Sequence, residues 1–172
     1  MGFGFTHLIA AWLAGKGYEH FSKKKISHYT WFFLLMGSIL PDADFLIDWT
    51  LGTELHRPFT HSLLFVIVAP IIIYSIFTLF DHPERRFFAL AVGVGIITHL
   101  LLDMFSPDGI PLLWPSLLHF SYGSIHYFDP ASVSVLRGSV EEFTLRMKRA
   151  ILDMALGATW IFYLWWKRRI QF

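Results

Sequence analysis

The sequence predicts an all-α integral membrane protein, a helical bundle with three full transmembrane helices and two short N-terminal helices that are buried or re-entrant. Composition is the first observation behind this prediction. Hydrophobic residues make up 55% of the 172 residues and charged residues only 16%, whereas soluble domains carry about 25% charged residues. The second is a set of apolar runs that approach the ~20 residues needed to cross a bilayer. The length suits a single membrane-embedded domain over residues 1–172.

Three segments are long and apolar enough to be predicted as full spans. Leu63–Phe80 is almost entirely aliphatic and aromatic, and Phe87–Phe105 carries its polar residues near its end. Ala150–Trp166 ends in WWKRR, a combination of aromatic and cationic side chains that is typical of a membrane interface. Two shorter apolar runs, Phe3–Ala14 and Tyr29–Leu40, cover about two-thirds of a span. We expect them to pack on the bundle as short helices.

Basic residues lie in short clusters beside the apolar runs and orient the chain. Lys23–Lys25 lies between the short helices, Arg85 and Arg86 lie between the first two spans, and Lys167–Arg169 follows the last span. Such clusters face the cytoplasm in membrane proteins. The resulting topology gathers most histidines and aspartates at the opposite face. We therefore expect a multi-pass protein of the cell (inner or plasma) membrane, with its polar site at the extracytoplasmic face.

Composition also excludes several classes of function. The formal net charge of +1 gives no sign of a nucleic-acid partner. The absence of cysteine excludes disulfides and thiolate metal ligands. No G-x-S-x-G motif is present, which argues against a serine esterase. The expected partners are membrane lipids and a lipid-like substrate, and the oligomeric state stays open.

His99 and Asp103 form the first candidate pair for a polar site. They are four residues apart in a predicted helix and therefore share one face. Ionisable residues inside a membrane helix are costly and mark functional sites that face the bundle interior. The alternative is a structural hydrogen bond that joins two helices, and this pair alone does not decide between the two.

Asp42 and Asp44 follow Pro41 in the sequence LPDAD. Proline disfavours helix in the preceding residue, so the two aspartates are predicted in a turn. From a turn, both carboxylates can point into one pocket. The simpler interpretation, that they only terminate a helix and are solvated, is less attractive beside a bundle rich in histidine.

His56 and His61 flank the sequence RPFT directly before a long apolar run. Thr60 is a good N-cap for the helix that follows. The positive end of a helix dipole favours a neutral imidazole, which is the form that binds metal. Arg57 carries a permanent charge that suits a phosphate or carboxylate. Capping at the membrane interface would explain Thr60 but does not require two histidines.

The candidates combine into one predicted metal site. A lone histidine in an apolar helix is more often a core residue, and His7 is included because the topology brings it to the same face. The predicted ligands are His7, Asp42, His56, His61, His99 and Asp103. Six nitrogen and oxygen ligands suit Zn²⁺, with Mn²⁺ or Fe as alternatives. They exceed the needs of one four-coordinate ion, so a di- or trinuclear site with Asp103 as bridge is expected.

Four more residues are secondary candidates for this cluster: His119, His126, Asp129 and Glu142. The histidines lie in an aromatic-rich segment, 106–149, that is predicted to form an ordered cap half-inserted in the membrane. Histidines in such segments are often amphipathic anchors. Glu142 also fits a capping box with Ser139 at the start of an interfacial helix.

Five motifs resemble, in order, the signature blocks of the YdjM-like, LexA-associated inner-membrane family of membrane-bound metal-dependent hydrolases. They are LPDAD, HRPFTHSLL, HLLLD, GIPLLWP and RGSVEE. The resemblance runs from His7 to about Glu142 and implies a bound metal and hydrolase activity. One departure is Pro58, where the family usually has glycine. More distantly, the order of histidines and aspartates is similar to that in zinc-dependent bacterial phospholipase C, which implies phosphoester chemistry.

We therefore expect a membrane-embedded hydrolase that uses metal-activated water on phosphoester bonds in a lipid-like or amphiphilic substrate. Asp42 or Asp44 would orient the water or act as general base, and Arg57 would bind substrate oxygens. One alternative is a non-catalytic metal-binding membrane protein, such as a sensor or a metal-handling subunit. Another is an ion- or proton-coupled transporter, which is disfavoured because the polar residues collect at one end of the spans.

Overall fold

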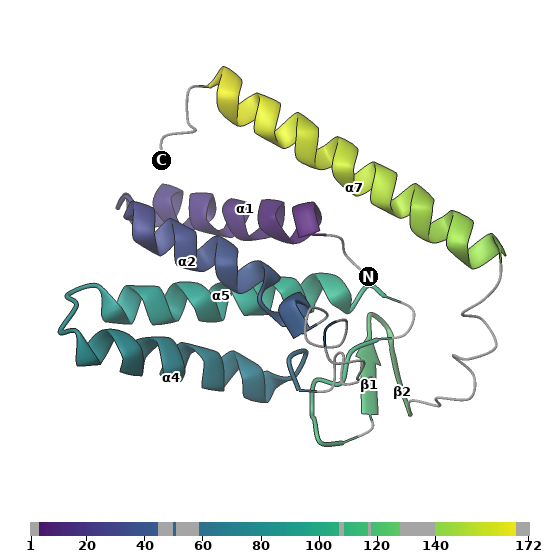
Figure 1. The fold of residues 1–172 in the computed structure, drawn as a ribbon, viewed down its shortest axis with the longest axis horizontal. Helices are drawn as coiled ribbons and strands as arrows, with labels where there is room; N and C mark the ends of the chain where they lie inside the picture. The colour runs from purple at the N-terminus through teal and green to yellow at the C-terminus, as the bar shows by residue number, and fades with distance from the viewer. Residues whose placement is uncertain are drawn as a thin grey trace.

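The computed structural model describes residues 4–44, 50, 59–106, 109–116, 118–127 and 140–167, without the side chains of residues 126, 140–142 and 146. The described helices are α1 (Gly4–Ser22), α2 (His28–Ile39), α4 (Leu63–Leu79), α5 (Arg85–Asp103) and α7 (Val140–Trp166). A short 3₁₀ helix, η1 (Pro41–Ala43), follows α2. Helix α5 packs against α1, α2 and α4, and α7 crosses the outer side of α1 (Figure 1).

Helix α5 is the centre of the bundle because one of its faces is apolar along most of its length. Phe88, Val92, Ile96 and Leu100 recur at four-residue spacing, and all four are buried. Inside a membrane, close van der Waals packing of such side chains against neighbouring helices stabilises the bundle, because lipid is as apolar as the helix interior. The same buried helix ends in two ionisable residues, so the packing that holds α5 in place also fixes the position of its polar end.

Two glycines bring α2 and α5 into backbone contact. A Cβ atom added at Gly37 would lie 2.5 Å from the carbonyl oxygen of Val92, and one at Gly95 would collide with the carbonyl oxygen of Leu34. Small residues allow such close approach between membrane helices. The contact fixes the position of Ser38, which follows Gly37 in α2 and is fully buried.

The two predicted N-terminal helices are present, but the first is longer than expected. Helix α2 matches the predicted run Tyr29–Leu40 closely. Helix α1 continues to Ser22 instead of ending at Ala14. Gly15, which ends the apolar run, does not break the helix: a side chain there would collide with the indole of Trp31. Glycine at this position therefore serves helix packing.

The prediction of three full spans is not confirmed by the described helices. Among them, α5 is the helix that is long and apolar enough to cross a membrane by length and composition. Helix α4 is apolar but has 17 residues, about 26 Å at 1.5 Å per residue. The third predicted span lies within α7, a continuous helix of 27 residues that also includes the predicted interfacial helix. Its N-terminal half contains the charged residues Lys148, Arg149 and Asp153.

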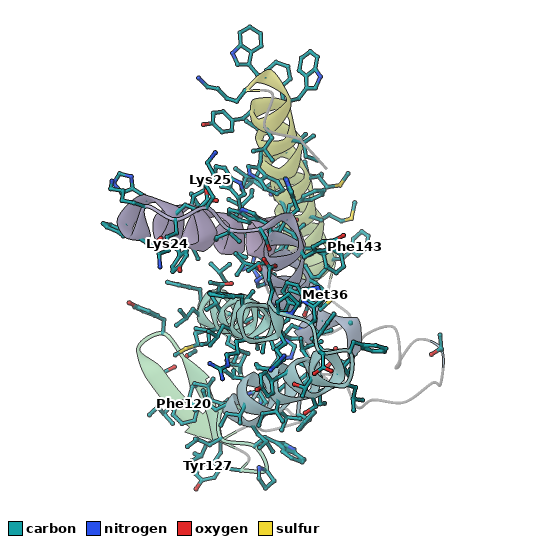
Figure 2. All side chains as sticks on the ribbon, turned by 90° about the vertical axis from the view of Figure 1, so that its left-hand side faces the viewer. Lys24, Lys25, Met36, Phe120, Tyr127 and Phe143 are labelled. Carbon is teal, nitrogen blue, oxygen red and sulfur yellow. The ribbon has the colours of Figure 1, made fainter. Side chains whose placement is uncertain are left out.

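The chain is mostly helical, but the prediction that it is entirely α is wrong for residues 118–127. Strands β1 (Leu118–Ser121) and β2 (Ser124–Tyr127) pair in an antiparallel hairpin. Gly123 in its turn has φ +92°, in the left-handed region that favours glycine. The hairpin lies beside the C-terminal end of α5 (Figure 1), and Figure 2 shows Phe120 and Tyr127 on it at the edge of the bundle.

The hairpin is tied to the end of α5 by its backbone and by one aromatic pair. The N–H of Tyr122 donates to the carbonyl of Met104 at 2.7 Å. The rings of Tyr122 and Phe105 stack with centroids 4.6 Å apart. Ile110, which is buried, exchanges two backbone hydrogen bonds with Phe120. Within the predicted cap, residues 118–127 therefore form a β-hairpin that is fixed to this end of the bundle.

Candidate metal centre

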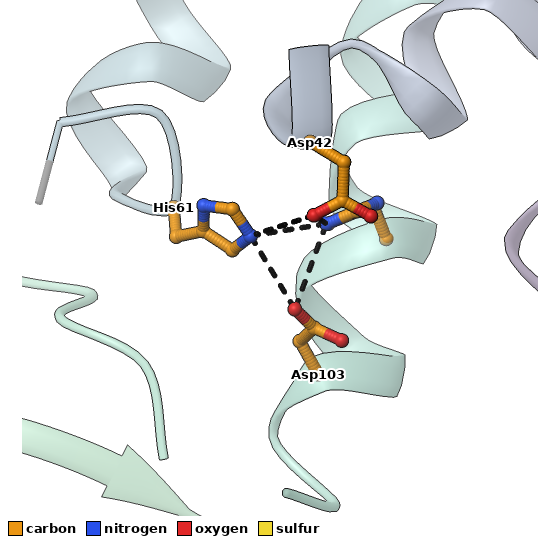
Figure 3. A group of neighbouring side chains, drawn as sticks. Asp42, His61 and Asp103 are labelled. Atoms are coloured by element: carbon orange, nitrogen blue, oxygen red, sulfur yellow. Dashed lines mark hydrogen bonds and ion pairs between the residues drawn. The ribbon is translucent and has the colours of Figure 1, made fainter. Parts of the chain in front are cut away.

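Several separate segments meet at one end of the bundle and bring ionisable side chains together. Asp42 comes from η1, His61 from the turn before α4, and His99 and Asp103 from the last turns of α5 (Figure 3). Arg85 begins α5 at the other end, 18 residues or about 27 Å away. The segment with Lys24 and Lys25 lies at that same end, which faces the viewer in Figure 2. These two basic clusters therefore lie at the end opposite the polar site, whereas Lys148 and Arg149 lie in the N-terminal half of α7.

The side chains of Asp42, His61, His99 and Asp103 present atoms that all lie within 4.8 Å of one another. The Nε2 atom of His61 is 3.5 Å from Asp42 Oδ1 and 3.3 Å from Asp103 Oδ2. The Nε2 atom of His99 is 3.6 Å from Asp42 Oδ1 and 3.7 Å from Asp103 Oδ2. The two Nε2 atoms are 3.2 Å apart.

The five distances that involve the histidine nitrogens are compatible with ligands of one ion and longer than typical hydrogen bonds. Tetrahedral ligands placed about 2.0–2.1 Å from zinc lie about 3.3–3.4 Å from one another. Charge-assisted hydrogen bonds between nitrogen and a carboxylate oxygen are shorter, at about 2.7–2.9 Å. The observed separations of 3.2–3.7 Å lie around the first value. Two imidazoles and two carboxylates are also a donor set that zinc accepts.

Hydrogen bonds behind the rings fix the tautomers of both histidines. His99 Nδ1 lies 2.7 Å from the carbonyl oxygen of Ser38, so it carries the proton. His61 Nδ1 lies 3.1 Å from the hydroxyl of Thr60, which donates its own proton to Asp44 and therefore accepts from His61. Both Nε2 lone pairs consequently point into the pocket and toward each other. Such an arrangement needs a cation or a proton between the rings.

The carboxylates of Asp42 and Asp103 also favour a positive charge in the pocket. Burial lowers the pKa of His61, but the neighbouring carboxylates of Asp103 and Asp42 outweigh it and hold that pKa above its ordinary value. Burial raises the pKa of Asp42, yet the imidazoles of His61 and His99 outweigh this and the pKa is lowered. Asp42 is therefore ionised at neutral pH, as a metal ligand must be.

Access to the cluster is from the side of Asp42. The side chains of His61 and His99 are fully buried and that of Asp103 is 4% exposed. The side chain of Asp42 is 40% exposed. An ion, a water molecule or a substrate group can therefore approach from one direction.

His7 of α1 reaches the same cluster. Its imidazole stacks on that of His99, with ring centroids 3.9 Å apart and an interplanar angle of 19°. Its Nε2 lies 3.5 Å from Asp103 Oδ1, the carboxylate oxygen that does not face the other two histidines. The prediction that topology would bring His7 to the other ligands agrees with this placement.

The structure places the remaining candidates differently or does not describe them. His56, Arg57 and Asp129 lie outside the described residues. Asp44 is not one of the four clustered residues, and one of its oxygens accepts the Thr60 hydroxyl. Of the secondary candidates, His119 lies in β1 opposite His126 in β2. His126 and Glu142 are described only by their backbone.

Two supporting interactions were missed or misassigned from the sequence. Thr60 was expected to cap α4, but the N-cap is Ser62, whose hydroxyl accepts from the N–H of Phe65 at 3.3 Å. Thr60 instead contacts the ring of His61. The contribution of Ser38 comes from its backbone carbonyl, for which no sequence signal exists.

A third supporting residue is Asp153 of α7, which was not among the predicted site residues. It is buried, and its carboxylate accepts hydrogen bonds from the N–H of Phe5 at 3.1 Å and of Thr6 at 2.7 Å, and from the Thr6 hydroxyl. A carboxylate at this position satisfies free N–H groups at a helix N-terminus and complements the helix dipole. Asp153 thereby fixes the turn that carries His7.

Comparison with known proteins gives the chain its family. A family model described as YdjM inner membrane protein matches residues 1–170. Inner membrane protein YdjM of Escherichia coli K12 is 38% identical over 69 residues, which cover 38% of this chain and 33% of that protein. Inner membrane protein YbcI of the same organism is 28% identical over 153 residues, covering 77% of this chain and 80% of that protein.

A further relative, the uncharacterized protein YvsG of Bacillus subtilis 168, is 36% identical over 63 residues, covering 37% of this chain and 36% of its own length. No solved structure matches the chain. The family model, in contrast, extends over both the histidine- and aspartate-containing segments and the C-terminal helix. The chain therefore belongs to the YdjM inner membrane protein family.

Proposed function

We propose that this protein is a metal-dependent hydrolase embedded in the inner membrane, which cleaves phosphoester bonds in a lipid-like or amphiphilic substrate. The observation that carries the proposal is the convergence of two imidazole nitrogens and two carboxylate oxygens, all within 4.8 Å, from separate segments of the fold. Asp42, His61, His99 and Asp103 would hold a divalent ion, with zinc favoured by the donor set.

A divalent ion in this pocket supplies Lewis acidity and lowers the pKa of water toward neutrality. The chain's own contribution is orientation and proton transfer. The Oδ1 atom of Asp42 faces the histidines, and the carboxylate is the exposed group of the cluster. Its Oδ2 atom can therefore orient a water molecule or accept its proton. Arg57, outside the described residues, keeps the role that its permanent charge suggests, which is to bind substrate oxygens.

The membrane location is supported by the names of the relatives YdjM and YbcI and by exposed apolar side chains. On α4, Leu64, Ile67 and Ile71 are 41%, 57% and 57% exposed. Continuous apolar surface of this kind requires lipid or protein beside it. In the proposed topology α4, α5 and α7 cross the membrane as a multi-pass arrangement, and the polar site lies at the extracytoplasmic face because the basic clusters lie at the other end.

A non-catalytic metal-binding protein is the second candidate, because four protein ligands can fill the shell of a structural zinc. The exposure of Asp42 favours the enzyme, since a solvent-accessible ligand can make room for water or substrate. The two functions differ in turnover and not in metal content, so one set of samples distinguishes them.

The test is elemental analysis of detergent-purified protein, followed by assays on phospholipid vesicles and on a generic phosphodiester. We expect metal and turnover in the wild type and loss of both in His99→Ala and Asp103→Asn. Two substitutions at the opposite end of the bundle serve as matched controls. His20→Ala replaces an exposed histidine. Asp81→Asn replaces an aspartate with φ +48° by asparagine, which also tolerates this backbone conformation. Metal in the wild type without turnover on either ester would favour the binding protein, and metal retained in Asp103→Asn and His99→Ala would refute the site.

A further inference from the structure

The imidazole of His7 is buried without an evident partner for its nitrogens. The residue has no exposed surface, and neither Nδ1 nor Nε2 has a hydrogen-bond partner within the described part of the chain. Leaving a buried polar group unpaired costs about 1–3 kcal/mol. The carboxylate oxygen that it contacts, Asp103 Oδ1, lies 3.5 Å from Nε2, too far for a hydrogen bond of ordinary length. This position is therefore suited to bind something between the two groups.

The two oxygens of Asp103 face different histidines. Its Oδ2 atom faces His61 at 3.3 Å and His99 at 3.7 Å, whereas Oδ1 faces His7. The separation of 3.5 Å between Oδ1 and His7 Nε2 again fits the distance of about 3.3–3.4 Å between two ligands of one zinc. A carboxylate in this arrangement can bind one ion through each oxygen.

The stack of His7 on His99 holds the two imidazoles at a spacing close to that between the ions of two-metal sites. Their rings are nearly parallel, with centroids 3.9 Å apart. Two-metal sites hold their ions about 3.5–4 Å apart. Both rings direct Nε2 toward the same carboxylate. Two parallel imidazoles at this spacing are thus arranged to bind two neighbouring ions that share Asp103.

The position of His7 is also fixed from outside the cluster. Thr6, which precedes it, and Phe5 donate their backbone N–H groups to Asp153 of α7. The ring of Phe5 lies against Gly157, where any side chain would collide with it. The first turn of α1 is therefore held against α7, and the imidazole that follows has a defined place.

We propose that His7 Nε2 and Asp103 Oδ1 hold a second divalent cation, bridged through Asp103 to the ion of the other three ligands. The inference rests on the proposed function, because Asp103 is shared. Within the described part of the chain, these two protein ligands leave most of the second ion's coordination to water or substrate oxygens. The second ion therefore binds more weakly than the first, and its open positions are the ones available to a phosphate group.

The experiment is a zinc titration of the detergent-purified full-length chain by equilibrium dialysis, with bound zinc counted by mass spectrometry. We expect wild type to bind two zinc ions per chain in a tight and a weak step. His7→Phe keeps an aromatic ring in the stack but offers no nitrogen, and we expect it to lose the weak step and keep the tight step. Loading with Mn²⁺ should give an exchange-coupled paramagnetic resonance spectrum in the wild type and the spectrum of isolated ions in His7→Phe.

Other outcomes separate this inference from the proposed function. A single tight step in the wild type, abolished by His61→Ala, would leave the proposed function standing and overturn the second cation. Two steps that persist in His7→Phe would overturn it as well, because His7 would not be a ligand. The absence of any bound zinc in the wild type would remove both proposals. Circular dichroism of each variant establishes that it is folded before its zinc is counted.

Discussion

The tautomers of His61 and His99 are set by groups that never touch the pocket. Ser38 accepts the Nδ1 proton of one ring through its carbonyl, and Thr60 accepts that of the other through its hydroxyl. With both protons held on the far side of the rings, the Nε2 atoms keep their lone pairs toward the carboxylates. In the proposed metal site, removing an acceptor would let a ring turn or exchange its tautomer and would weaken metal binding without removing a ligand.

Thr60→Val tests this at the level of one atom, because valine keeps the shape of threonine and lacks the hydroxyl. Loss of such an outer partner costs about 10- to 100-fold in metal affinity. We expect this decrease in the tight zinc step, measured by competition with a chelator. Thr60→Ser, which keeps the hydroxyl, should bind zinc nearly as tightly as wild type. Equal affinity in Thr60→Val and wild type would show that His61 is not oriented through Thr60.

At this scale the side chains of the candidate site were more predictable than their supports. His99 and Asp103 are visible in the sequence because ionisable residues are rare in apolar helices. The role of Ser38 is not visible, because a backbone carbonyl is common to every residue. Thr60 was misassigned because Ser62, two residues later, is an equally good N-cap.

Among the elements, the contact of α2 with α5 determines whether the site forms. Gly37 and Gly95 let the two backbones approach, and this approach brings the carbonyl of Ser38 to His99. A side chain at either glycine would push the helices apart at the point where the ligands begin. Stability and metal binding are therefore coupled through this contact.

Gly37→Ala is expected to destabilise the protein by about 1–3 kcal/mol through overpacking, because its Cβ would lie 2.5 Å from the carbonyl oxygen of Val92. It should also weaken zinc binding. Gly17→Ala is the matched control: it lies in α1 with open space around it and should stabilise by roughly 0.5–1 kcal/mol. Unfolding in detergent, followed by circular dichroism, measures both. Similar stability in Gly37→Ala and Gly17→Ala would contradict the close approach.

Elements were predictable where the apolar pattern alone determines them. The centre of α5 and the position of α2 follow from uninterrupted apolar runs. The extension of α1 does not, because Gly15 has the same appearance in a sequence whether it ends a helix or makes room for Trp31. The hairpin was missed because exposed aromatic residues such as Tyr122 and Tyr127 do not give a strand pattern distinct from that of an interfacial loop.

On the scale of the whole molecule, the first and last described helices meet where α7 lies on α1. The buried carboxylate of Asp153 binds N–H groups that are 147 and 148 residues away in the sequence. This contact could not be predicted, because it pairs a side chain with backbone groups that carry no sequence label. The gathering of these histidines and aspartates at one end could be predicted, because the basic clusters before α2 and α5 lie at the other end, independently of those residues.

Asp153→Ala should release the start of α1 from α7, since loss of a helix-capping side chain costs about 0.5–2 kcal/mol. The chain has no native cysteine, so spin labels can be attached at Leu13 and Phe162, which are both exposed. We expect a narrow distance distribution between the labels in the wild type and a broad one in Asp153→Ala. Asp153→Asn retains an oxygen acceptor and should restore most of the narrow distribution. An unchanged distribution in Asp153→Ala would mean that other contacts hold α7.

The contact between α1 and α7 also imposes an order on biogenesis. A ribosome completes α1 long before it begins α7, so during translation the first turn of α1 lacks the carboxylate that holds it. The imidazole in that turn gains its final place only after the last helix has been inserted. In the proposed two-ion site, binding of the second ion would therefore follow translation.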